Sequence, residues 1–175
     1  MHDELLQFQR NDVWTLVPRP EGVHIISIKW IFRNKTDEEG NVIRNKACLV
    51  TQGYLQMEGV DYDETFTPVA HMESIKILLA LICHLSFKLY QMDVKTAFLN
   101  EIHKEDVYVA QPKGFIDPHF PDHVLYLKKA LYGLKQALRA WYNRLTHYLV
   151  SHGFTKGKAN QTLFIKREDS ELMAS

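Results

Sequence analysis

The sequence has few cysteines, no long apolar run and no net charge, and each of these features argues against a class of protein. Only two cysteines, Cys48 and Cys83, occur in 175 residues, and they form no CxxC pair. A disulfide framework is therefore not indicated, which fits a reducing compartment. The longest apolar run, residues 77–83, is too short to span a bilayer, and the N-terminus lacks the pattern of a signal peptide. We expect an intracellular protein, either cytoplasmic or of unknown compartment, without a membrane partner.

Motifs of two common enzyme classes are also absent. The sequence contains neither a GxxxxGK[ST] phosphate loop nor a cluster of cysteine and histidine with the spacing of a zinc site. No internal repeat, low-complexity tract or Gly/Ser-rich linker divides the chain. Its length fits one domain or a piece of a larger one.

The charges cancel overall but are unevenly distributed. The sequence has 21 Lys and Arg against 21 Asp and Glu, which as a total argues against a nucleic-acid-binding protein. Residues 57–74, however, hold five acids and no Lys or Arg, whereas residues 124–158 hold seven Lys or Arg and no acid. This segregation indicates either an electrostatic binding surface or simply the solvated face of a helix.

The pattern of apolar and turn-forming residues predicts an α+β fold in which helices pack against an antiparallel sheet. Two strand-like stretches flank the turn-forming cluster TDEEGN and predict a β-hairpin. Apolar residues at helical spacing predict a buried amphipathic helix and, later, a second helix that ends at Gly153. The predicted order is a hairpin of residues 25–35 and 42–53, a helix of 72–86, strands of 87–94 and 105–112, a helix of 134–154 and a strand of 162–166.

Asp93 is conspicuous because it closes a short apolar run and leads directly into VKTAFLN. Aspartate is disfavoured inside strands and costly to bury without a partner. Two explanations remain open on these residues alone. Asp93 either caps a helix that begins at Val94, or it meets a cation.

Six stretches, in the same order, match the motifs of one known family. They are NDVWTLVPRP, IKWIFRNKTDEEGNVIRNKACLVTQGYLQMEGVDYDETFTPVA, YQMDVKTAFLN, EDVYVAQPKGF, LYLKKALYGLKQALRAWY and GFTKGKANQTLFIK. With these motifs the chain closely resembles the reverse transcriptase domain of copia-type retrotransposons, a part of retrovirus-related Pol polyproteins. The resemblance implies an N-terminal lead (1–10), a domain with a fingers hairpin and an incomplete polymerase palm (11–166), and a C-terminal tail (167–175).

The resemblance also implies a two-metal site for template-directed nucleotidyl transfer. Asp93 corresponds to the first catalytic aspartate, which would bind Mg²⁺ together with the backbone carbonyl of Val94. Magnesium prefers hard oxygen ligands, and the ions would activate the primer 3′-hydroxyl and stabilise the leaving pyrophosphate. A strand end would be a suitable position for this carboxylate.

The remaining implied roles concern substrate binding. Phe98 corresponds to an aromatic gate against the ribose 2′-hydroxyl, although an ordinary core phenylalanine is the alternative. Lys135 and Arg139, four residues apart, would share one helix face and contact phosphates. The implied partners are an RNA or DNA primer–template and deoxynucleoside triphosphates. The implied nucleotide-binding residues are Lys46, Phe98 and Lys135, and the implied nucleic-acid-binding residues are Lys135, Arg139 and Arg144.

The sequence departs from the family pattern in two respects that bear on activity. The Tyr-Val-Asp-Asp motif, whose aspartates complete the metal site in the family, occurs nowhere in the 175 residues, and Cys48 replaces the usual arginine of KARLV. One carboxylate cannot hold two closely spaced divalent ions. We therefore expect that the isolated chain does not polymerise DNA. The alternative to a polymerase fragment is a decayed transposon remnant, at most a nucleic-acid- or protein-binding module.

Overall fold

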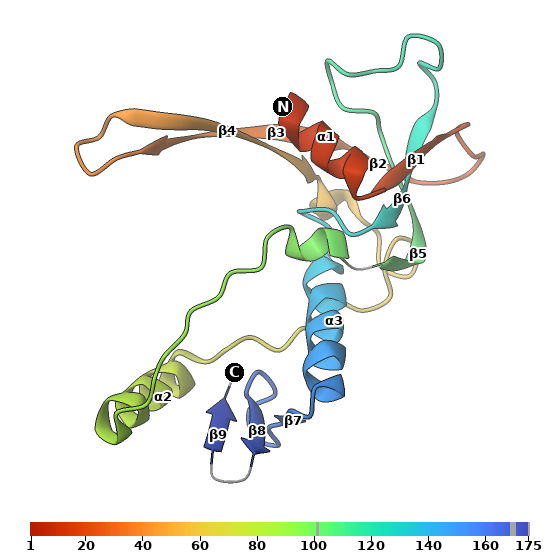
Figure 1. Cartoon of the computed structure of the whole chain (residues 1–175). Helices are drawn as coiled ribbons and strands as arrows, with labels where there is room; N and C mark the ends of the chain where they lie inside the picture. Colours follow the sequence, from red (N-terminus) through yellow and green to blue (C-terminus); the bar gives the residue numbers. More distant parts are fainter. Residues whose placement is uncertain (101, 169–170, 175) are drawn as a thin grey trace. The chain divides into compact units, whose positions relative to one another are not determined.

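The computed structural model describes residues 1–100, 102–168 and 171–174, and these residues divide into two units. Unit 1 comprises Met1–Thr65 and Thr96–Trp141, and unit 2 comprises Phe66–Lys95 and Tyr142–Ser175. Helices and strands occur in both units, so the predicted α+β class is confirmed (Figure 1). No helix in the described part of the chain combines the length and apolar character needed to cross a membrane.

A four-stranded sheet in the order β1-β6-β5-β2 forms the centre of unit 1. The pairs β1–β6 and β5–β6 are antiparallel, whereas β2 pairs with β5 in parallel, so the predicted antiparallel sheet has one exception. Sequence analysis did not predict the first helix, α1, or the strands β1 and β6. The elements are α1 (His2–Arg10), β1 (Trp14–Val17), β2 (Ile25–Ile26), β5 (Ile102–Val109) and β6 (Val124–Lys129).

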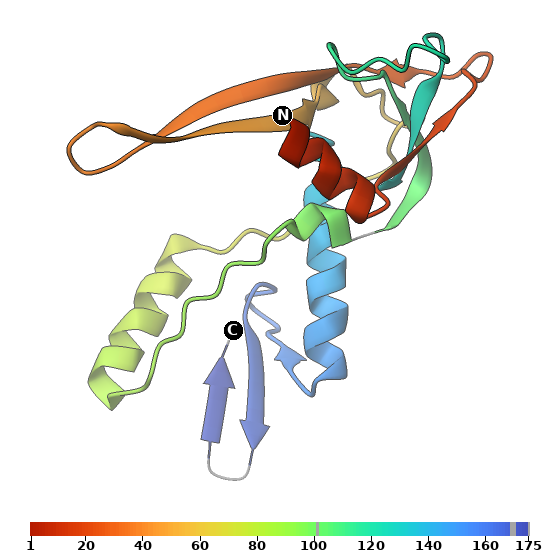
Figure 2. The same cartoon turned by 45° about the horizontal axis from the view of Figure 1, so that its top comes forward.

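The predicted hairpin is confirmed as β3 (Ile28–Thr36) and β4 (Val42–Thr51). Figure 2 shows that it extends as a long two-stranded ribbon away from α1 and the sheet of unit 1. The carboxylate of Asp37 stabilises its turn by accepting backbone N–H bonds from Glu39 (3.1 Å) and Asn41 (2.8 Å). The start of the predicted first strand differs, because β2 pairs with the sheet and not with β4. The predicted second strand ends two residues early, at Thr51, because Gly53 begins a 3₁₀ helix, η1 (Gly53–Leu55).

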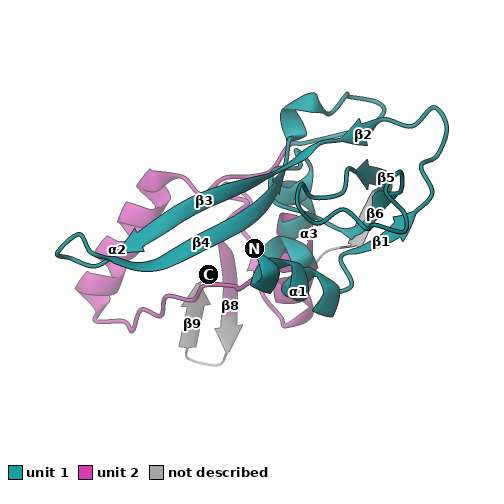
Figure 3. Cartoon of the chain, turned by 90° about the horizontal axis from the view of Figure 1, so that it is seen from above, with its two compact units in different colours: residues 1–65, 96–141 teal, residues 66–95, 142–175 magenta. Residues whose placement is uncertain are grey.

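Unit 2 contains helix α2 (Met72–Leu85) and most of helix α3 (Ala137–Ser151), which Figure 3 shows in magenta. It also contains a small antiparallel sheet. Both helices were predicted, and Gly153 follows the end of α3 at Ser151 as the predicted terminating glycine. There the backbone has φ +86°, and Phe154 N–H donates to the Leu149 carbonyl at 3.0 Å, closing a Schellman motif. The small sheet has the order β7-β8-β9, with β7 (Thr155–Lys156), β8 (Phe164–Glu168) and β9 (Glu171–Ala174).

The predicted burial of the helix of residues 72–86 is wrong. Residues of α2 follow the expected helical spacing, but none of them is buried, and Met72 and Ile77 are more than half exposed. Spacing of apolar residues defines a face of a helix, but it does not provide the element that covers this face. In the described part of the chain, no element buries it.

The predicted strand of residues 87–94 is also wrong. Ser86 ends α2 in the left-handed conformation, and residues 87–94 continue without regular structure. Phe87, Leu89 and Met92 in this segment are exposed. A strand requires a neighbour for its backbone groups, and no described strand pairs with this segment.

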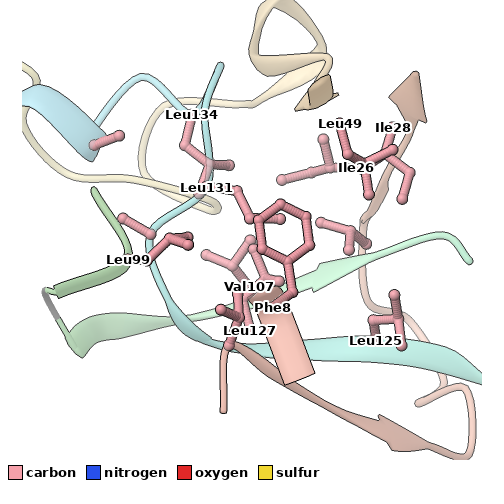
Figure 4. Packing of buried hydrophobic residues seen from close by; sticks show 14 residues of the cluster. Phe8, Ile26, Ile28, Leu49, Leu99, Val107, Leu125, Leu127, Leu131 and Leu134 are labelled. Carbon is pink, nitrogen blue, oxygen red and sulfur yellow. The ribbon is translucent and has the colours of Figure 1, made fainter. Parts of the chain in front are cut away.

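The hydrophobic core lies in unit 1 and joins α1, the central sheet and the base of the hairpin. Figure 4 shows the ring of Phe8 from α1 at the centre of the cluster, with Val107 and Leu127 of the sheet beside it. Leu49 of β4 and Leu131, in the loop after β6, are also fully buried in this cluster. The core therefore fixes the loop of residues 130–136, which carries Lys135, one of the predicted site residues.

Candidate functional site

Asp93 and Val94 lie in the irregular segment of unit 2 and are both exposed. The expectation that Asp93 closes a strand is therefore wrong. The alternative, a helix beginning at Val94, is not observed either. A turn follows, with Thr96 at φ +53°, and a short 3₁₀ helix, η2, begins only at Ala97 (Ala97–Asn100).

The described residues do not form a magnesium site by themselves. Among them, no three His, Cys, Asp or Glu side chains come together in a way that could hold a metal ion. Asp93 has no hydrogen bond or ion pair within the described part of the chain. A pair of magnesium ions would thus need further carboxylates besides Asp93, and the role of Asp93 remains a prediction.

Phe98 lies in η2 and belongs to unit 1. Its ring packs edge-on against the ring of Tyr132, with 4.9 Å between the centroids. The neighbouring Leu99 is fully buried in the core, whereas Phe98 is only partly buried. The contact with Tyr132 positions the ring and leaves part of it accessible, as an aromatic gate against the ribose 2′-hydroxyl would require. The gate role of Phe98 remains a prediction.

The loop that carries Tyr132 is held against the end of β4. Thr51 donates both its backbone N–H (2.8 Å) and its hydroxyl (2.9 Å) to the carbonyl oxygen of Tyr132. Gly133, at φ +93°, packs so closely that an added Cβ would collide with the backbone oxygen of Thr51. The loop and the base of the hairpin are therefore joined by direct backbone contacts.

Lys135 is held by uncharged partners. Its ammonium donates to the hydroxyl of Tyr62 (2.9 Å) and the carbonyl of Gln56 (3.4 Å), and lies 4.7 Å from the centroid of the Tyr62 ring. Its backbone N–H donates to Oε1 of Gln56 at 2.8 Å. No carboxylate in the described residues pairs with this ammonium, so its positive charge is fixed in place but not neutralised.

Buried polar side chains hold the segment that contacts Lys135. Nε2 of Gln56 donates to Oε1 of Gln136 at 3.0 Å, and Nε2 of Gln136 donates to the carbonyl of Asp61 at 3.2 Å. The Asp61 carboxylate in turn accepts from the Met57 N–H (2.8 Å) and lies 2.7 Å from Nδ1 of His24. Sequence analysis noted the acidic composition of residues 57–74 but did not predict this network. Its hydrogen bonds join residues up to 80 positions apart, so no local pattern indicates it.

The guanidinium of Arg139 forms an ion pair with Glu64, a residue of the same acidic stretch (residues 57–74). Its Nη2 lies 2.7 Å from Oε2 of Glu64, and its Nη1 donates to the Glu64 carbonyl at 3.2 Å. Helix α3 begins only at Ala137, so the expectation that Lys135 and Arg139 share a helix face is wrong; Lys135 lies in the preceding turn. Arg144, further along α3, is exposed and belongs to unit 2.

Lys46 belongs to a basic face of the hairpin. It lies directly opposite Arg33, and Lys35 lies opposite Arg44 on the same face, because residues two apart along a strand project to the same side. All four side chains are exposed. The structure thus brings Lys46 together with three cations that sequence analysis did not single out.

A family model described as "Reverse transcriptase (RNA-dependent DNA polymerase)" matches residues 11–174. The chain is 44% identical over 164 residues to the Retrovirus-related Pol polyprotein from transposon RE1 of Arabidopsis thaliana, and 45% identical over 164 residues to that from transposon RE2 of the same organism. It is 38% identical over 167 residues to the Retrovirus-related Pol polyprotein from transposon TNT 1-94 of Nicotiana tabacum.

These similarities cover almost all of the chain but a small part of each relative. They include 93% of the chain for RE1 and RE2 and 95% for TNT 1-94. The chain spans 11% of the RE1 and RE2 polyproteins and 13% of the TNT 1-94 polyprotein. No solved structure matches the chain.

Proposed function

The chain belongs to the reverse transcriptase (RNA-dependent DNA polymerase) family, and we therefore propose that it supplies the fingers and part of the palm of a retrotransposon polymerase. In this proposal the hairpin β3–β4 corresponds to the fingers. The substrates are an RNA or DNA primer–template and deoxynucleoside triphosphates. Because the relatives are much longer, template-directed DNA synthesis would be an activity of a longer protein that contains these residues.

The observation that carries this proposal is that uncharged groups position the ammonium of Lys135. Its ammonium is positioned by neutral partners and has no carboxylate partner in the described residues. A fixed cation that is not neutralised can bind an anionic phosphate oxygen without first breaking an ion pair. Phosphate groups are the feature that nucleotides and nucleic-acid backbones share, so Lys135 suits either ligand.

Other residues are proposed to complete substrate binding. Phe98, supported by Tyr132, would exclude a ribose 2′-hydroxyl by its volume. Lys46, beside Arg33 on the hairpin, would contact the triphosphate. Arg139 and Arg144 would contact the nucleic-acid backbone, where cations give affinity without reading sequence.

Asp93 and the carbonyl of Val94 are proposed to contribute one ligand each to a magnesium site. Bound Mg²⁺ would supply Lewis-acid stabilisation of phosphoryl oxygens. The described residues lack the further carboxylates that such a site needs. We therefore assign no catalytic step to this set of residues.

Nucleic-acid binding by the purified chain tests the proposal. We expect fluorescence anisotropy to show salt-dependent binding of a labelled RNA–DNA primer–template. The variant Lys135→Gln should weaken binding roughly three- to tenfold and reduce the slope of log K against log salt by about one phosphate contact. Lys113→Gln is the matched control, because Lys113 is exposed and lies outside the loop.

Equal losses in the two variants would mean that only net charge matters and would contradict the role of Lys135. Wild-type binding would also be expected of the alternative, a remnant that kept binding without catalysis. Complete absence of binding at low salt would contradict the proposal and agree with a decayed remnant that has lost nucleic-acid binding.

A further inference from the structure

Lys135 and Arg139, the two proposed phosphate contacts, differ in whether a carboxylate of the described residues pairs with them. Lys135 faces a hydroxyl, a carbonyl and an aromatic ring. Arg139 faces the carboxylate of Glu64, at 2.7 Å from Nη2. Among the residues that the structure describes, Arg139 has a carboxylate partner that neutralises its charge, and Lys135 has none.

The way in which Glu64 contacts Arg139 resembles the contact of a phosphate group with an arginine. Glu64 presents a charged oxygen to Nη2 and its backbone carbonyl oxygen to Nη1. Arginine characteristically binds two oxygens of a phosphate in the same manner, with its two terminal nitrogens. Glu64 therefore fills the positions on Arg139 that two phosphate oxygens would take.

This ion pair can open without disturbing the fold. The side chains of Arg139 and Glu64 are 36% and 59% exposed, and exposed ion pairs contribute little to stability. By contrast, Asp61 and Tyr62 attach the same acidic stretch to the loop of residues 130–136, and they are only 5% and 8% exposed. The Glu64 side chain can thus move while the buried residues Asp61 and Tyr62 stay in place and Tyr62 continues to contact Lys135.

We propose that Glu64 occupies Arg139 in place of a nucleic-acid phosphate, so that Arg139 joins the contact with nucleic acid only after Glu64 releases it. Lys135 needs no such release and binds first. The inference rests on the proposed function, because it assumes that these cations bind a phosphate backbone. It adds an intramolecular competitor that lowers the affinity of the site.

The test compares two variants that remove the same charge from neighbouring positions. Glu64→Gln removes the competitor, whereas Asp63→Asn removes an exposed carboxylate with no hydrogen bond or ion pair in the described part of the chain. We expect Glu64→Gln to bind a labelled RNA–DNA duplex about two- to fivefold more tightly than Asp63→Asn, the range for opening one exposed ion pair. In an Arg139→Gln background, the difference between the two variants should disappear.

Each other outcome has a distinct meaning. If the wild-type chain binds but Glu64→Gln and Asp63→Asn behave alike, competition by Glu64 is wrong and the proposed function stands. Weaker binding by Glu64→Gln, or a gain that persists with Arg139→Gln, would also overturn the competition. If neither the wild-type chain nor Glu64→Gln binds the duplex at low salt, both proposals fail.

Discussion

Cys48 illustrates how neighbouring groups set the chemistry of a single side chain. It lies on β4, two residues from Lys46 and closer to the base of the hairpin. Burial and the carboxylate of Glu4 on α1, which accepts a hydrogen bond from the thiol, raise the pKa of Cys48 to about 11, against the weaker opposing effect of Lys46 and Arg33. Cys48 therefore stays a protonated thiol at neutral and mildly alkaline pH.

The two cysteines should consequently differ in reactivity. Only the thiolate is nucleophilic, so at pH 8 we expect iodoacetamide to modify the exposed Cys83 at least roughly tenfold faster than Cys48. Mass spectrometry of tryptic peptides would give both rates. Glu4→Gln should accelerate the modification of Cys48, whereas Asp3→Asn, on the same helix, should not. Equal rates for the two cysteines would contradict the environment described for Cys48.

The raised pKa also has a consequence for stability. The folded state holds the Cys48 proton more tightly than the unfolded state, whose thiol has a pKa near the ordinary 9.0. The corresponding stabilisation is present below pH 9 and is lost as the pH rises through about 11. Cys48→Ala should remove this part of the alkaline decrease.

At the scale of elements, the loop of residues 130–136 depends on close backbone packing at Gly133. A side chain there would meet the backbone oxygen of Thr51 and would also be strained at φ +93°. We expect Gly133→Ala to lower the free energy of unfolding by about 3 kcal/mol, from strain plus collision. Urea denaturation followed by circular dichroism would measure the change.

Gly114→Ala separates the two contributions. Gly114 has a similar φ of +85°, but an added Cβ would have nothing within 4 Å. It should therefore show only the strain, about 1 kcal/mol. Equal losses at the two positions would show that the contact between the loop and Thr51 is not essential.

Elements determined by local sequence could be predicted, whereas those that need a distant partner could not. The turn residues around Asp37 and the helix-ending Gly153 each act within a few residues, and both predictions are confirmed. For residues 72–94 the apolar composition was read correctly, but the covering helix or neighbouring strand that burial and pairing require is not found in the described part of the chain. Helix α1 was missed although acids in its first turn and Arg10 in its last indicate a helix.

The same distinction applies to the candidate site. Lys135 and Arg139 could be singled out from a motif, but their different partners could not, because Tyr62 and Glu64 lie more than 70 residues earlier in the chain. Charge segregation indicated a surface of interest without indicating that the acidic and basic segments contact each other. Only the tertiary structure shows which cation is neutralised.

At the scale of the whole molecule, family membership and catalytic capacity must be separated. The described residues contain Asp93 but no group of three metal-ligating side chains. We expect the purified 175-residue chain to give no primer extension with Mg²⁺ and deoxynucleoside triphosphates, since one carboxylate cannot hold two ions. A gel-based extension assay would check this. Template-dependent extension that Asp93→Asn abolishes would contradict the expectation.

The network around Lys135 also determines when this site appears during folding. The β3–β4 hairpin closes a short loop and can form within about 10 μs. The hydrogen bonds that join Gln56, Gln136 and Asp61 must bring together segments 75–80 residues apart, which carries a larger entropic cost of loop closure and slows formation. Lys135 therefore acquires its partners late, after the hairpin has formed. A partly folded chain would display its basic hairpin while still lacking the organised cation at Lys135.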